Sequence, residues 1–320
     1  MVNVVMIGTG NALLEHKKSW KSIKGVTLVG ILDTHSGSLK SDVSQEKALY
    51  VNEMNDIKQR DVDMVDICVP FNERAEWIKK VADMNMDIVC TEPFGKTPED
   101  MMAIIESCKE NTVAFYPDHV FHNRPAYANA QAQIRRGAIG QPGVLRFAVN
   151  EPHPGNGMSI FTGLGSSLFA WICDTFGAVS RVTAKHVQKK TRNGMPVEYG
   201  VVILRLADGT IAHVELTWAG NDSRSSFELS GDGGMLQYDS GSSAPIQVDR
   251  FSETGMIPAS DTVLNEPVLK RQLNEAVTSA VSKNASDGLD HYTYAMEIVK
   301  AVTESVQKRE SVALKGGATS

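Results

Sequence analysis

The 320-residue sequence lacks the features that mark membrane-spanning, secreted and nucleic-acid-binding proteins. No apolar stretch approaches the ~20 residues of a transmembrane helix, and the N-terminus enters a strand-like run without a basic, cleavable leader. Its 32 Lys and Arg are outnumbered by 38 Asp and Glu that are spread evenly, so the chain has no basic stripe for a polyanion. We therefore expect a cytoplasmic protein that binds neither membranes nor nucleic acid.

Cysteine is equally scarce, with four scattered residues and no C-x-x-C pair of the kind that binds zinc or performs redox chemistry. Cys68 and Cys90 end apolar, strand-like runs, where a cysteine behaves as a small buried hydrophobe. We expect no metal site built on these thiols.

The N-terminal segment has the pattern of a strand-helix-strand unit that binds a dinucleotide. A β-rich run over residues 3–7 is followed by a glycine turn, a segment of helical period that runs through Trp20, and a second run that ends at Asp33. The glycines allow a tight turn that presents bare N–H groups to a pyrophosphate, and an acid ~20 residues later can bind a ribose diol. The alternative is a purely structural turn. The predicted cofactor contacts are Gly8, Gly10, Asn11, Ala12 and Asp33.

Two details refine this prediction. Leu13 occupies the position of the third glycine of G-x-G-x-x-G, where a large side chain would push the helix away from the strand and alter cofactor binding. Asp33 would repel a 2′-phosphate, and the following Thr34-His35-Ser36 supplies no arginine. The expected cofactor is therefore NAD, with NADP less favoured.

Strands and helices continue to alternate as far as Asp118, which predicts a doubly wound parallel sheet. A helix then carries the apolar stripe Tyr127, Ala130 and Ile134 and stops at Gly137. The second half contains closely spaced β-rich runs, and Asp208-Gly209 between two of them indicates an antiparallel hairpin. Two helical segments, 268–282 and 292–307, and a short run at 312–314 complete the chain.

A series of landmarks in a fixed order supports a family resemblance. They are Gly8-Thr9-Gly10 with Asp33, Asp63-Met64-Val65, Val69-Pro70-Phe71-Asn72, Cys90-Thr91-Glu92-Pro93, residues 136–143, Phe176-Gly177, residues 206–210 and Asp287-Gly288. Over its whole length the chain resembles the glucose-fructose oxidoreductase, inositol dehydrogenase and rhizopine-catabolism (Gfo/Idh/MocA) family. This resemblance implies an α/β protein with an N-terminal Rossmann domain, residues 1–118, and a C-terminal α/β domain, residues 119–320, that has an open, mostly antiparallel sheet for substrate binding and oligomerisation.

The resemblance also places residues at the nicotinamide end of the cofactor and at the catalytic positions. It implies that Val69, Pro70, Asn72, Glu92 and Pro93 flank the nicotinamide ribose. Family enzymes that oxidise a sugar or polyol use the lysine of C-E-K-P and the aspartate and histidine of D-x-G-x-H. Counting back without gaps from Phe176-Gly177 places these three groups on Glu92, Gly163 and Ser167, so the usual proton-transfer groups are substituted.

Several residues could replace them. Glu92 could act as acid or base if burial near the nicotinamide raised its pKa. His119 and His122 follow the fifth strand together with Asp118 and could transfer a proton, whereas their spacing fits no strong metal template. Lys96 and His153 are further candidates, although a solvated lysine and a surface-loop histidine are the favoured interpretations. The catalytic prediction is Glu92, His119 and His122.

We expect an NAD(P)-dependent oxidoreductase that transfers a hydride between nicotinamide and a sugar, polyol or related hydroxylated substrate. The alternatives are NAD-assisted lyase or glycosidase chemistry, in which oxidation is transient, and a non-catalytic nucleotide-binding sensor or partner protein. The apolar runs 201–204 and 211–214 would leave an exposed sheet face, which predicts a homodimer or homotetramer.

Overall fold

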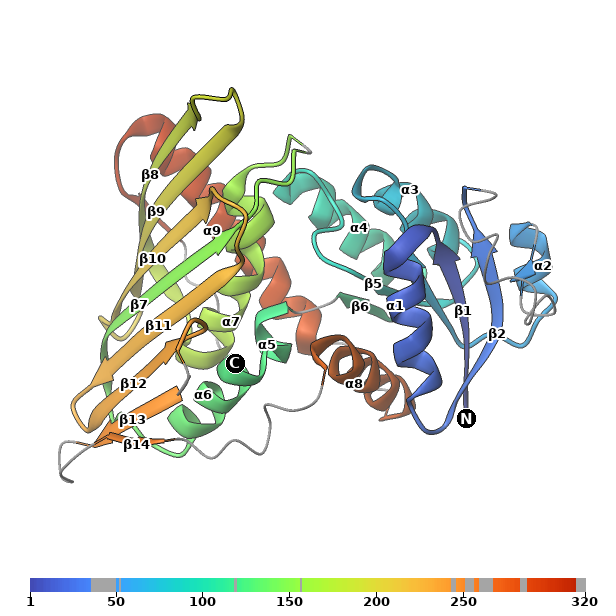
Figure 1. Ribbon diagram of the computed structural model, residues 1–320, viewed down its shortest axis with the longest axis horizontal. Helices are drawn as coiled ribbons and strands as arrows, with labels where there is room; N and C mark the ends of the chain where they lie inside the picture. The colour runs from blue at the N-terminus through green and yellow to red at the C-terminus, as the bar shows by residue number, and fades with distance from the viewer. Residues whose placement is uncertain are drawn as a thin grey trace. The chain divides into compact units, whose positions relative to one another are not determined.

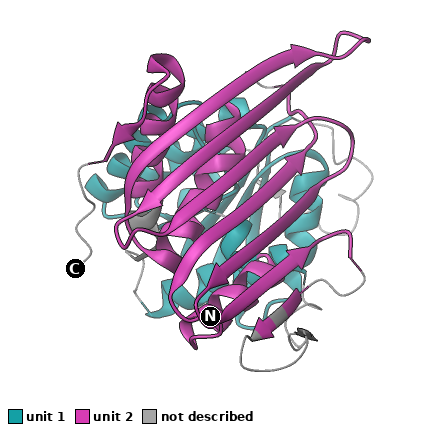
Figure 2. Cartoon of the chain, turned by 90° about the vertical axis from the view of Figure 1, so that its left-hand side faces the viewer, with its two compact units in different colours: residues 1–123, 266–290 teal, residues 124–265, 291–320 magenta. Residues whose placement is uncertain are grey.

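The computed structural model describes residues 1–35, 50–51, 53–117, 120–155, 157–242, 246–250, 256–258, 267–282 and 287–314. The chain forms two compact units (Figures 1 and 2), unit 1 with residues 1–123 and 266–290 and unit 2 with residues 124–265 and 291–320. The division into domains at residue 118 remains a prediction, and these contacts add residues 266–290 to the N-terminal unit. Within the described ranges no helix has the length and apolar character needed to cross a membrane.

Unit 1 contains a six-stranded parallel sheet in the order β3-β2-β1-β4-β5-β6, with helices in the connections (Figure 1). The order reverses at β1, whose neighbours are β2 and β4. In such sheets ligands bind outside the carboxyl ends of the strands at the point of reversal. The elements are β1 Val2–Gly8, α1 Gly10–Lys21, β2 Val26–Asp33, β3 Tyr50–Val51, α2 Met54–Lys58, β4 Met64–Cys68, α3 Phe71–Ala82, β5 Asp87–Cys90, α4 Pro98–Glu110, β6 Phe115–Pro117, α5 Val120–Asn123 and α8 Val268–Ser282.

The late helix α8 belongs to unit 1 because it completes an apolar core. Leu273, Ala276 and Val277 of α8 join Leu13 and Trp20 of α1 in one buried cluster that also includes residues of β1 and β4. Burial of these side chains removes apolar surface from water at roughly 25 cal/mol per Å², which stabilises the folded chain. Thr112 adopts a left-handed turn with φ of 58°, and β6 begins three residues later, at Phe115.

Unit 2 contains a nine-stranded sheet in the order β14-β13-β12-β11-β7-β10-β9-β8-β15. Every neighbouring pair is antiparallel except β7 and β10, so the predicted α/β fold class, with its mostly antiparallel second sheet, is confirmed. The elements are α6 Pro125–Arg135, β7 Pro142–Glu151, the π-helical turn η2 Phe161–Gly165, α7 Ser166–Phe176, β8 Val179–Lys190, β9 Pro196–Leu206, β10 Ile211–Trp218, β11 Arg224–Gly231, β12 Gly234–Asp239, β13 Ile246–Arg250, β14 Met256–Pro258, α9 Asp287–Lys308 and β15 Val312–Ala313.

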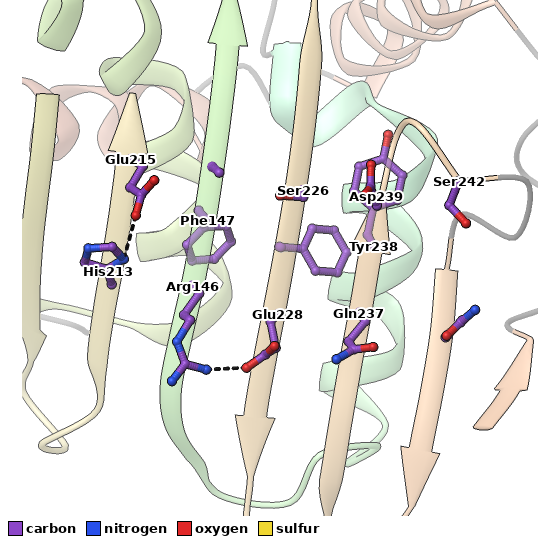
Figure 3. A pocket seen from close by; sticks show the side chains of 13 residues that line it. Arg146, Phe147, His213, Glu215, Ser226, Glu228, Gln237, Tyr238, Asp239 and Ser242 are labelled. Atoms are coloured by element: carbon purple, nitrogen blue, oxygen red, sulfur yellow. Dashed lines mark hydrogen bonds and ion pairs between the residues drawn. The ribbon is translucent and has the colours of Figure 1, made fainter. Parts of the chain in front are cut away.

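One face of this sheet is covered by α6, α7 and α9, and the other is open (Figures 1 and 2). Side chains alternate accordingly along β9: Val202 and Leu204 are buried, whereas Val201 and Ile203 are 37% and 42% exposed. A hollow of about 460 Å³ lies on the sheet. Among the side chains that line it, Figure 3 shows Arg146 paired with Glu228 and His213 paired with Glu215. The open face therefore combines exposed aliphatic side chains with a charged concavity.

Candidate functional site

The glycine turn joins β1 to α1, and its two glycines each meet a requirement that other residues do not. A Cβ atom on Gly8 would lie 2.4 Å from the carbonyl oxygen of Cys68, so only glycine allows β1 to approach β4 this closely. Gly10 has φ of 66°, and a Cβ atom there would meet nothing within 4 Å. Thr9 makes no side-chain cap to α1, whose first turn contains no acidic residue. The first turn of α1 therefore places no acid of its own at the positive end of the helix.

The other predicted contacts of this turn lie on its exposed side. Asn11 and Ala12, in the first turn of α1, are exposed, whereas Leu13 is fully buried in the core shared with α8. Leu13 thus points into the protein rather than towards the glycine turn, and it serves as a core residue at the position of the third glycine.

Asp33 ends β2 beside the same turn. Its Oδ1 accepts the backbone N–H of His35 at 3.1 Å, and the N–H of Thr34 donates to the carbonyl oxygen of Gly8 at 3.1 Å. These bonds hold the tip of β2 against the glycine turn. A half-buried carboxylate at this point can accept hydrogen bonds from a ribose diol, as the sequence predicts. Ser36, which follows in the sequence motif, lies outside the described residues.

Arg74, which no sequence pattern indicated, holds together the two turns that the family resemblance places at the nicotinamide end. Its Nη1 donates to the carbonyl oxygens of Thr91 at 3.0 Å and Pro93 at 2.8 Å, and its Nε donates to that of Val69 at 3.3 Å. The residue lies in the first turn of α3, four residues after Pro70, which caps that helix. The signal that the sequence offered was an arginine four residues after the Val69-Pro70 pair, which follows a predicted strand.

Glu92 lies in the turn after β5, is 9% exposed, and precedes a cis peptide bond to Pro93, which the sequence alone left open. Asn72 and Lys96 are exposed, and both line a hollow of about 430 Å³ between α3 and α4. Lys96 therefore has the solvated environment that the sequence favoured.

Only part of the predicted histidine cluster of unit 1 lies within the described residues. His119 and Asp118 lie outside the described residues. His122 is half-buried in α5. The structure thus describes one of the two histidines that the sequence selected for proton transfer.

Unit 2 explains why position 163 carries no side chain. Gly163 lies in η2, and a Cβ atom there would lie 2.5 Å from the ring of Trp218, which is 2% exposed. The space that an aspartate would need is filled by the indole. Ser167, in the first turn of α7, is 4% exposed, and among the described residues its Oγ has no hydrogen-bond partner.

Beside this turn, a carboxylate on β9 lies between two imidazoles. Glu198 Oε1 is 3.4 Å from His153 Nε2, and Glu198 Oε2 is 3.1 Å from His186 Nε2. The sequence favoured a surface position for His153, but its side chain is only 14% exposed and packs edge-on against Trp218. His186 and Glu198 occupy the helix-facing alternate positions of their strands, which was the pattern that could have revealed them.

One more ionisable group is buried in unit 1. The Asp66 carboxylate accepts hydrogen bonds from His16 Nδ1 at 2.8 Å and Trp20 Nε1 at 2.6 Å, and Cys68 Sγ lies 3.5 Å away. His16, Asp66 and Cys68 lie close enough to bind an ion, yet burial, followed by the Asp66 charge, raises the pKa of the Cys68 thiol well above its usual value. A protonated thiol is a poor ligand, so we interpret this group as a hydrogen-bond network that ties α1 to β4.

The residues of unit 1 fit a dinucleotide. The glycine turn leads into the N-terminus of α1, Asp33 offers an acceptor at the same sheet edge, and Arg74 orders the turns after β4 and β5. At these positions, none of the chain's departures from the family pattern removes a group that pyrophosphate or ribose binding requires.

Comparison with known proteins agrees with this geometry. Residues 2–119 match the family described as "Oxidoreductase family, NAD-binding Rossmann fold", and residues 127–237 match the "GFO/IDH/MocA C-terminal domain". A D-apiose dehydrogenase of Paraburkholderia graminis is 25% identical over 139 residues, which cover 43% of this chain and 37% of that protein. The chain therefore aligns with less than half the length of this curated relative.

Solved structures share the fold over 98% of this chain and 98% of theirs. An oxidoreductase from Agrobacterium radiobacter in complex with NAD+, L-tartaric acid and magnesium has a TM-score of 0.80 at 18% identity. A levoglucosan dehydrogenase in complex with NADH and L-sorbose has a TM-score of 0.79 at 17% identity. The two family matches and the two-unit fold together show that this chain belongs to the Gfo/Idh/MocA oxidoreductase family.

Proposed function

We propose that this protein is an NAD-dependent oxidoreductase that transfers a hydride between nicotinamide and a sugar, polyol or related hydroxylated substrate. The observation that carries the proposal is the pairing of Asp33 with the open glycine turn, held together by the Thr34 N–H bond to Gly8. The relatives named as dehydrogenases of apiose and levoglucosan support a polyhydroxylated substrate.

Each residue has an assigned task in this proposal. The turn from Gly8 through Gly10 to Asn11 and Ala12 binds the pyrophosphate, and Asp33 binds the adenosine ribose. We assign NAD rather than NADP because a 2′-phosphate would meet the Asp33 carboxylate, and like charges repel.

The nicotinamide end is assigned to the two turns that Arg74 fastens. Val69, Pro70 and Asn72 on one side and Glu92 and Pro93 on the other would flank its ribose. When bound, the nicotinamide ring supplies a carbon that accepts or returns a hydride. The task of these residues is to fix the ring and exclude water from it. The predicted acid-base groups of unit 1 remain Glu92, His119 and His122. Glu92 occupies the position of the family's lysine.

The proposal is tested in two steps. Calorimetric titration with NADH and NADPH measures whether and which dinucleotide binds, and we expect the tighter binding for NADH. NADH formation is then followed across a panel of inositols, alditols, aldoses and sugar acids. Turnover with one class supports the dehydrogenase. Product formation without NADH accumulation would instead support transient oxidation, and binding without any product would support a sensor. Absence of binding at millimolar dinucleotide contradicts all three.

We also propose that the protein forms a homodimer or homotetramer through the open face of the unit 2 sheet. Its exposed aliphatic side chains, such as Val201, Ile203 and Ile211, form an apolar surface of the kind that mediates association. Light scattering with size-exclusion chromatography gives the mass, and Ile203→Glu should lower it to that of the monomer.

A further inference from the structure

The hollow between α3 and α4 has the size of a small-molecule site. The two helices lie side by side (Figure 1), and the hollow between them measures about 430 Å³. Small-molecule sites usually measure ~300–1,000 Å³. All of the residues that line it fall within the range 71–107, so the hollow lies wholly within unit 1.

Apolar side chains form most of the wall of this hollow. They recur on one side of each helix, at Phe71, Ala75 and Ile78 of α3 and at Ala103 and Ile104 of α4. Ile78 is 1% exposed, whereas the other four are half-buried or exposed and can be reached by a ligand. Transfer of a ligand's apolar surface from water onto this wall is favourable.

The base of the hollow is held in place by packing. Phe94 and Gly95 line it from below, and the fully buried Phe94 ring packs edge-on against Phe115, with 4.8 Å between the ring centroids. A Cβ atom on Gly95 would lie 2.9 Å from the main-chain nitrogen of Met101, so glycine allows this segment to lie against the first turn of α4. A ligand therefore meets a base that is already ordered, which lowers the entropic cost of binding.

Two lysines give the hollow a positive charge. Lys79 and Lys96 both line it and are exposed, and within the described residues neither ammonium group has an ion-pair partner. Asp100 is the acid among the lining residues, and its carboxylate already accepts the N–H of Thr97 at 3.1 Å in the cap of α4. The two cations exceed this one acid, so the hollow favours a ligand with an anionic group.

The distribution of exposed apolar groups favours a small ligand over a protein. Among the described residues, the large hydrophobic side chains with the greatest exposure lie on other elements, such as β9 and β10, and none lies on α3 or α4. The apolar groups of these two helices therefore line a recess and do not form the broad exposed patch that mediates association.

We propose that this hollow binds a small amphipathic carboxylate. Its aromatic or aliphatic body packs against the apolar wall of α3 and α4, and its carboxylate pairs with Lys79 and Lys96. Of the lining residues, Asn72 alone has a task in the proposed function. The hollow therefore takes its ligand with or without NADH.

The first test compares three probes by calorimetric titration. The probe 2-naphthoate has both the apolar body and the carboxylate, 2-naphthamide lacks the charge, and acetate lacks the apolar body. We expect 2-naphthoate to bind about tenfold more tightly than 2-naphthamide at low salt, because it can pair with two ammonium groups, and the difference to shrink at high salt. Acetate should not bind at millimolar concentration. Equal binding of the two naphthalene probes, or no binding of 2-naphthoate, overturns the proposal.

The second test locates the bound probe. Lys79→Ala and Lys96→Ala should each weaken 2-naphthoate binding about threefold, and the double variant about tenfold, with 2-naphthamide binding unchanged. Ala103→Glu, at an exposed position of the wall, should weaken 2-naphthoate binding more than tenfold, because it places a like charge beside the carboxylate. Lys80→Ala is the matched control, because Lys80 is exposed on the same helix and pairs with Glu76 at 2.7 Å. Lysine variants that bind 2-naphthoate as the wild type does contradict the assignment.

Two competing occupants are tested with the same protein. Displacement of 2-naphthoate by NADH would assign the hollow to the cofactor and overturn the proposal, whereas simultaneous binding supports it. A mass that falls to that of the monomer in Ala103→Glu, measured by light scattering, would assign the hollow to a second copy of the chain. Protein that binds 2-naphthoate as expected but no dinucleotide contradicts the proposed function alone.

Discussion

Replacing Arg74 by alanine should loosen the two turns that we assign to the nicotinamide end of the cofactor. The guanidinium makes three hydrogen bonds to main-chain carbonyls, at 2.8, 3.0 and 3.3 Å. Hydrogen bonds from a charged donor contribute about 1.5–3 kcal/mol each. Arg74 is half-buried and its bond to Val69 is long, so we count only the two shorter bonds, at the lower end of the range, and expect a loss of about 3 kcal/mol in the free energy of unfolding.

Part of this loss should appear in cofactor binding. We take about half of the lost free energy of unfolding to reflect disorder of the turns at Val69 and Pro93. NADH binding must then order these turns, so the affinity for NADH falls about tenfold, which equals about 1.4 kcal/mol. Arg74→Lys should give an intermediate result, because an ammonium group lacks the planar fork that reaches two turns at once. Urea unfolding and calorimetric titration measure the two effects.

Lys79→Ala is the matched control, since Lys79 is an exposed cation on the same helix. An Arg74→Ala variant within about 0.5 kcal/mol of the wild-type stability would refute the bonding argument, given the size of hydrogen bonds to charged groups. A destabilised variant with unchanged NADH affinity would instead refute the assignment of these turns to the cofactor.

Three other predictions follow from single contacts. Gly163→Ala should destabilise the protein by about 1–3 kcal/mol through overlap with Trp218, and a second change, Trp218→Phe, should recover part of it in urea unfolding; additive effects would contradict the overlap. Burial raises the pKa of Cys108 from 9.0 to about 11. The unfolded chain therefore ionises first, and the free energy of unfolding should be flat below pH 9 and fall by up to about 1.4 kcal/mol per pH unit between pH 9 and 11. Cys108→Ala should remove this part of the pH dependence of the free energy of unfolding, and an unchanged pH dependence in the variant would contradict the assignment to Cys108. Asp33→Ser should raise NADPH affinity relative to NADH by about tenfold or more in calorimetry, because a charge that opposes the 2′-phosphate is lost, and an unchanged ratio would exclude Asp33 from the ribose site.

The sequence predicted those elements whose signals are local. The helix 268–282 has the bounds that its pattern indicated, and Asp208-Gly209 forms the expected hairpin between β9 and β10. Gly137 ends α6 with φ of 80°, as its position after an apolar stripe implied. Each of these signals depends on residues a few positions apart.

The sequence pattern did not reveal α7. Residues Ser166 to Cys173 are all buried, so the helix has no polar face and its period does not show. Arg74 was missed for a related reason: its three acceptors lie 5 to 19 residues away in two turns, and only folding brings them to one guanidinium.

The sequence by itself determined the order of strands and helices, the glycine turn with Asp33, and membership of the family, because periodicity and turn chemistry act over short stretches of chain. Tertiary structure alone decided the surroundings of Gly163 and of Glu198. Trp218, 55 positions after Gly163, fills the room for a side chain there, and Glu198 joins histidines 12 and 45 positions away. Such long-range contacts follow from sheet register and helix packing, which no local sequence pattern encodes.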